Sequence, residues 1–146
     1  MTLQITIENQ QKKIPLKIPL LRRVAQRILN HEGISRGALS FVFVSDQKIR
    51  AFNKKFLGRD HPTDVLAFDL REKFSPKAVH ADIMISTHTA CRNAKIFKTS
   101  PRHEIILYMA HGVLHLLGYD DHKSGDVKRM RAKEQELLSV LKHFLK

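Results

Sequence analysis

The chain has 146 residues, of which 42% are hydrophobic; this is enough for one domain with its own core, and it excludes wholesale disorder. The 26 Lys and Arg against 14 Asp and Glu give a formal net charge of +12, which favours a polyanionic partner such as nucleic acid. Cys91 is the only cysteine, no apolar run approaches the ~20 residues of a membrane span, and the N-terminus does not resemble a secretory signal, so we expect a cytoplasmic protein.

The first third of the chain predicts strands and helices in alternation. Residues 2–8 alternate apolar and polar side chains, as in a half-buried strand. Residues 20–29 carry apolar side chains at helical spacing, and Gly33 is a typical residue for the end of that helix. The β-branched and aromatic run at 39–44 predicts a second strand, after which Ser45 can cap a helix.

The middle of the chain predicts two more strands. The apolar segments 65–68 and 79–86 have strand character and flank a loop at 69–78. Thr87 can then cap a helix that turns Phe97 inward.

The last third predicts two helices. Ser100 followed by Pro101 is a good helix start, and this helix runs to Leu117 before Gly118. An amphipathic pattern then predicts a final helix over 127–144. About four strands and five helices indicate one sheet covered by helices.

The most informative residues lie at the end of the fourth helix. His111 and His115 are four residues apart, so they project side by side from one helix face and can chelate one metal ion. The glycine that follows lets the chain turn back, and Asp121 or His122 could complete a three-ligand site. Histidines at this spacing also occur by chance, but the helix, the glycine and the further donors together favour a metal site. Three protein ligands with one open position are typical of catalytic zinc.

The residue after the first histidine bears on the reaction. Zinc peptidases of the His-Glu-x-x-His type use a glutamate there as general base, whereas this chain has Gly112, which cannot accept a proton. We therefore favour a hydrolase that relies on the metal ion and nearby cationic side chains. Two alternatives remain open: a metal-dependent hydrolase of another bond, such as a peptidase, and a non-catalytic RNA- or ribosome-binding module whose metal is structural.

The segment His-Gly-x-Leu-His-Leu-x-Gly-Tyr-Asp resembles the signature of the YbeY family of single-strand-specific endoribonucleases. Three further segments are similar to the family in the same order: Pro62–Phe68, preceded by Asn53 and Phe56; Asp82–Ser86; and Met130–Glu134. Four motifs in order over most of the chain make this a specific resemblance.

The resemblance implies an α+β fold in a single domain over 1–146, with a mixed four-stranded sheet surrounded by about five helices. It also implies one catalytic Zn²⁺ and a single-stranded RNA substrate. The family's role suggests action in 16S rRNA 3′-end maturation and ribosome quality control, with the small ribosomal subunit and an associated GTPase as partners.

The chain departs from the family pattern at two site positions. Asp121 stands where the family commonly has a histidine as third ligand; spacing favours Asp121, and His122 stays open as the alternative. Leu57 stands where the family often has an arginine that stabilises the phosphate. Arg59, two residues on, could take this role or could be a solvated loop residue.

Two neighbouring residues also have alternative interpretations. Asp64 could orient a ligand histidine, although capping a turn is the better interpretation, and His61 could be a proton donor or a surface residue.

Overall fold

A four-stranded mixed sheet forms the centre of the structure, a computed structural model that describes residues 2–146. The strand order is β1-β2-β4-β3, with the first three strands parallel and β3 antiparallel to β4 at one edge. The strands are β1 (Leu3–Asn9), β2 (Arg36–Val44), β3 (Val65–Asp69) and β4 (Ala78–Ser86). The expected α+β class with a mixed four-stranded sheet is confirmed.

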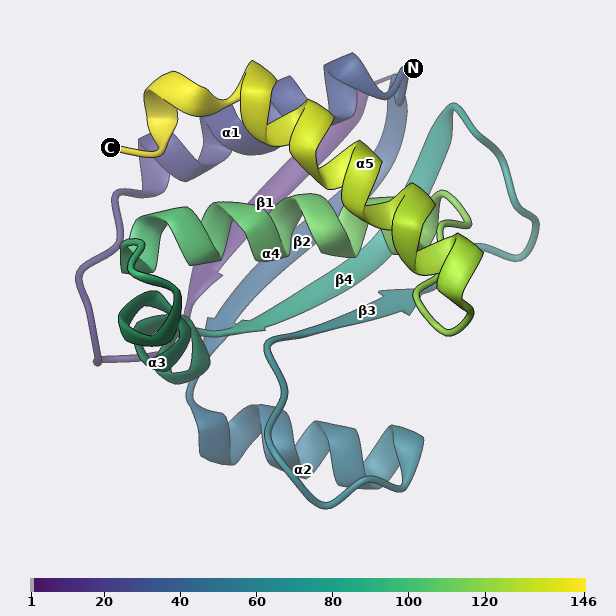
Figure 1. Cartoon of the computed structure of the whole chain (residues 1–146). Coiled ribbons are helices and arrows are strands. Elements are labelled where there is room, and N and C mark those ends of the chain that lie inside the picture. The colour runs from purple at the N-terminus through teal and green to yellow at the C-terminus, as the bar shows by residue number, and fades with distance from the viewer. Residues whose placement is uncertain (1) are drawn as a thin grey trace.

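Helices cover both faces of this sheet (Figure 1). They are α1 (Ile18–His31), α2 (Asp46–Leu57), α3 (Thr87–Phe97), α4 (Pro101–Leu116) and α5 (Ser124–Val140), followed by the 3₁₀ turn η1 (Lys142–Phe144). The larger core lies under α1, α4 and α5, whereas a smaller core, which includes Ile49 and Met84, lies under α2 on the opposite face. Among residues 2–146, no helix has the length and apolar character needed to cross a membrane.

The helix α4 is the centre of the larger core. It contacts α1, α3, α5 and two strands, and ten of its sixteen residues are buried. Gly112 is what lets it lie close to β4, because a Cβ added there would be 2.8 Å from Cγ2 of the buried Ile83. The glycine that deprives the chain of a peptidase-type base therefore has a packing role.

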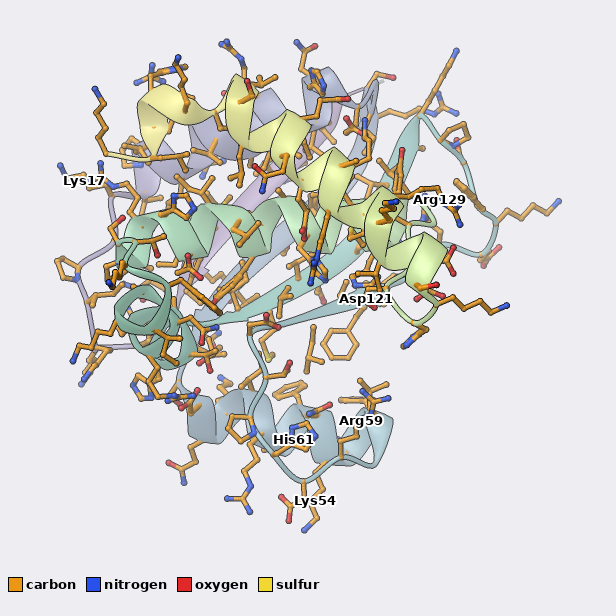
Figure 2. All side chains as sticks on the ribbon, viewed as in Figure 1. Lys17, Lys54, Arg59, His61, Asp121 and Arg129 are labelled. Atoms are coloured by element: carbon orange, nitrogen blue, oxygen red, sulfur yellow. The ribbon has the colours of Figure 1, made fainter. Side chains whose placement is uncertain are left out.

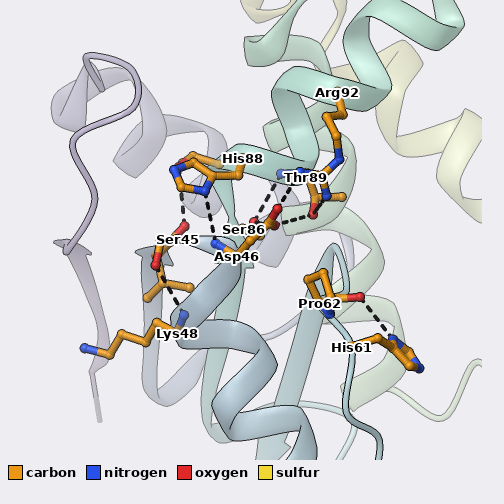
Figure 3. Close-up of polar contacts among 11 residues, drawn as sticks. Ser45, Asp46, Lys48, His61, Pro62, Ser86, His88, Thr89 and Arg92 are labelled. Atoms are coloured by element: carbon orange, nitrogen blue, oxygen red, sulfur yellow. Dashed lines mark hydrogen bonds and ion pairs between the residues drawn. The ribbon is translucent and has the colours of Figure 1, made fainter.

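The helix α2 is fastened to the sheet by its first residue, Asp46 (Figure 3). Its carboxylate accepts hydrogen bonds from the hydroxyls of Ser86 and Thr89, at 2.6 and 2.8 Å, and from the guanidinium of Arg92. Burial alone would raise the pKa of this carboxyl, but these hydrogen bonds and the charge of Arg92 bring it below its ordinary value. The network holds α2 against the start of α3.

Three details of the expected helices are wrong. The cap of α3 is Ser86, whose Oγ accepts from the backbone N–H of Thr89, and Thr87 is the first helical residue. Phe97 is not turned inward but is 63% exposed, because it is the last residue of α3. The helix expected over 127–144 ends at Val140 and gives way to the 3₁₀ turn.

Candidate metal centre

Two imidazoles and a carboxylate meet at the C-terminal end of α4. The Nε2 atoms of His111 and His115 are 2.9 Å apart, and they lie 3.5 and 3.9 Å from Oδ2 of Asp121. One nitrogen or oxygen of each residue falls within 4.8 Å of the others, which is close enough for a shared cation. Asp121 reaches the pair because Gly118 adopts a φ of +93°, a conformation that favours glycine, and so turns the chain back over the helix.

Asp121, rather than His122, is the residue that points its donor atom at the two histidines. The side chain of His122 is 72% exposed, and its Nε2 lies 3.4 Å from a carboxylate oxygen of Asp120. Asp120 in turn accepts hydrogen bonds from the backbone N–H groups of the two residues that follow it, which fixes the loop. His122 lines the same cleft as the candidate ligands without joining their cluster.

Glu134 is the residue of this site that sequence reasoning missed. It lies on α5, is 15% exposed, and accepts a hydrogen bond from Nδ1 of His111. With the ring proton engaged at Nδ1, the Nε2 of His111 is left as the unprotonated nitrogen that a metal ion requires. Asp64, to which sequence analysis gave this role as one alternative, instead accepts from the backbone N–H of Val65 and caps the turn before β3.

The surroundings shift the pKa values of the two imidazoles in opposite directions. Burial lowers the pKa of His115 below its ordinary value, and the neighbouring His111 lowers it further, against the opposing charge of Asp121. Burial by itself would lower the pKa of His111, but the hydrogen bond and charge of Glu134 raise it above the ordinary value. Glu134 therefore favours the charged form of His111, whereas burial and the neighbouring His111 disfavour the charged form of His115.

The three donors open into a cleft of about 540 Å³ between α4 and the segment that joins α2 to β3. Arg59 and His61 line its other side, and Figure 2 shows them at α2, opposite the loop that carries Asp121. Asn53 holds this segment in place, since its side-chain amide donates to the carbonyl of His61 at 2.9 Å. The guanidinium of Arg59 makes no ion pair with any residue in the described range 2–146.

The chain is similar to one characterised family over nearly its whole length. Residues 6–142 match the family model described as endoribonuclease YbeY. A Geobacter metallireducens protein named endoribonuclease YbeY is 37% identical over 145 residues, covering 95% of this chain and 96% of the relative. An Aquifex aeolicus protein of the same name is 36% identical over 135 residues, covering 92% and 90%.

A solved structure shows the same fold. The solution structure of TM1509 from Thermotoga maritima superposes with a TM-score of 0.66 at 27% identity, covering 97% of this chain and 91% of that one.

Proposed function

The chain belongs to the YbeY family of endoribonucleases, and on that premise we propose that it is a zinc-dependent endoribonuclease that cleaves single-stranded RNA. The observation that carries this proposal is the meeting of two Nε2 atoms and one carboxylate oxygen at the wall of an open cleft. The net charge of +12 supports a polyanionic substrate.

The donor set fits a zinc ion. Imidazole nitrogens and a carboxylate oxygen are ordinary zinc ligands, and the carboxylate of Glu134 on the far nitrogen of His111 is the usual means of fixing a ligand ring. In the described part of the chain three donors gather here rather than four, which supports a catalytic ion over a structural one. We therefore propose His111, His115 and Asp121 as the ligands, with His122 as the alternative third ligand.

Several residues of the chain would contribute directly to phosphodiester cleavage. A bound zinc ion supplies a Lewis acid for a phosphate oxygen and a means of lowering the pKa of water. His111 and His115, as proposed catalytic residues, would hold the ion at the wall of the cleft. We propose that Arg59, which lines the cleft and is free of ion pairs within residues 2–146, neutralises the negative charge that builds on the phosphate oxygens.

The family resemblance extends the proposal to the biological substrate. We propose that the RNA is ribosomal, that the enzyme acts in 16S rRNA 3′-end maturation and ribosome quality control, and that the small ribosomal subunit and an associated GTPase are its partners. A cytoplasmic location follows from that role.

Elemental analysis paired with a nuclease assay tests the proposal. The purified protein should carry one zinc ion per chain and should cleave single-stranded but not double-stranded RNA, and chelation should abolish cleavage. His115→Ala should lose both the zinc and the cleavage, whereas His103→Ala, on the same helix but at its other end, should keep both. Full cleavage by a zinc-free His115→Ala protein would overturn the proposal.

A further inference from the structure

An exposed aromatic side chain lies in the same cleft as the candidate metal centre. Phe56, at the end of α2, is 54% exposed, and the adjoining Leu57 is exposed to the same extent. Both line the cleft that His111, His115 and Asp121 open into. Exposed apolar side chains scattered singly need no explanation, but two adjacent ones beside a candidate catalytic centre indicate a binding surface.

The ring of Phe56 is held in place by two other rings. Phe52 stacks against it with 5.8 Å between ring centroids, and Phe68 of β3 meets it edge-on at 5.5 Å. Phe52 and Phe68 in turn pack against the smaller core under α2. An aromatic surface supported in this way is presented to solvent without a loss of side-chain freedom on binding.

One cationic group lies over this ring and another lines the cleft beside it. The ammonium of Lys55 lies over the ring of Phe56, 5.3 Å from its centroid, on an exposed side chain that an incoming base would displace, and Arg59 lines the same cleft. An aromatic face with neighbouring positive charge is the combination that binds single-stranded nucleic acid, because the base stacks on the ring and the cations pair with phosphates. An apolar peptide would gain nothing from these charges.

We propose that Phe56, backed by Phe52 and Phe68, is the stacking platform for one unpaired base of the RNA next to the cleaved phosphate. This inference rests on the proposed function and adds a source of its selectivity. In a duplex both faces of a base are covered by its neighbours, so only a base that has left the stack can present a face to Phe56. The contact therefore favours single-stranded substrates at the cleavage site.

Binding to an uncleaved analogue tests the platform apart from catalysis. The zinc-loaded protein is titrated with a short single-stranded oligoribonucleotide that is methylated at every 2′-hydroxyl, and with versions that lack one base at each position in turn. Phe56→Leu, which keeps an apolar side chain but removes the ring, should weaken binding by about 5- to 150-fold. Phe56→Trp should keep the affinity, and Phe97→Leu, an exposed ring on α3 outside the cleft, should not change it.

Removal of the stacked base supplies the decisive comparison. One abasic position should weaken binding to the wild-type protein by the same factor as Phe56→Leu, and should cost the Phe56→Leu protein little further. Unfolding midpoints and zinc content of each variant show that the loss is not one of folding.

The stacking role would be overturned if the abasic position weakened binding equally in the wild-type and Phe56→Leu proteins. It would also be overturned if Phe56→Leu bound the intact oligoribonucleotide as tightly as the wild type. The role would likewise be overturned if an apolar peptide bound tightly in competition with the RNA while RNA binding did not depend on Phe56. If the wild-type protein cleaves single-stranded RNA in those cases, the proposed function stands and only this inference fails. If it neither cleaves nor binds RNA, the proposed function itself is wrong.

Discussion

Removing the carboxylate of Glu134 should weaken zinc binding although this residue is not a proposed ligand. Its oxygen accepts the Nδ1 proton of His111, and the two side chains are only 15% and 20% exposed, so water replaces the lost partner poorly. In Glu134→Ala, the ring of His111 loses the group that fixes both its orientation and its tautomer. Losses of about 10- to 100-fold in metal affinity are typical of such changes, which corresponds to roughly 1.4–2.7 kcal/mol.

Competition with a zinc chelator of known affinity measures the effect. Glu134→Gln should lose less than Glu134→Ala, because the amide oxygen can still accept from Nδ1. Glu136→Ala is the matched control, since this residue lies on the same helix but bonds to His31 and Lys133 instead. If Glu134→Ala bound zinc as tightly as the wild type, or no more weakly than Glu136→Ala, the argument for His111 as an oriented ligand would be refuted.

Three further predictions follow from the packing and the charges described above. Asp121→Ala should reduce zinc affinity by more than about 100-fold, because it removes a proposed ligand and not merely a residue that orients one, whereas His122→Ala should not. The reverse result in the chelator competition would make His122 the third ligand. Gly112→Ala should destabilise the fold by about 1–3 kcal/mol in urea unfolding because its Cβ meets Ile83, whereas Gly125→Ala, whose Cβ meets nothing closer than 3.8 Å on the exposed start of α5, should be neutral or stabilising; equal effects would contradict the packing role. The pKa of Asp46 is lower in the folded than in the unfolded chain, so its stabilisation is full above pH ~4 and is lost as the pH falls through the folded-state value; unfolding midpoints of Asp46→Asn should therefore fall less with acid than those of the wild type, and parallel curves would exclude this source.

The parts of the site that could be predicted from the sequence are those set by local geometry. The spacing of His111 and His115, the glycine corner and the donor beyond it all lie within one short stretch, so the helix period and the turn bring them together. Ser45 and Ser100 cap helices as expected for the same reason, since each accepts from a backbone N–H three residues on.

The parts that were missed depend on how distant elements pack. Glu134 reaches His111 only because α5 crosses α4, and no local pattern distinguishes it from the other charged residues of its helix. The helical spacing of Phe97 predicts a core position, but this residue ends α3 and its side chain is 63% exposed. For Arg59 the sequence leaves two alternatives open, because its position in the cleft is a property of the loop path, which Asn53 fixes from within α2.

The position of α4 has a consequence for how the site moves. His111 and His115 are borne by the most enclosed helix of the molecule, so their backbone cannot loosen without disrupting the packing of three other helices and the sheet. Amide hydrogens of Met109 to Val113 should consequently exchange with deuterium only at the rate of global opening, whereas those of the loop around Asp121 should exchange far sooner. Of the three candidate ligands, Asp121 would then be the one whose backbone opens more readily than that of the helix bearing the two rings.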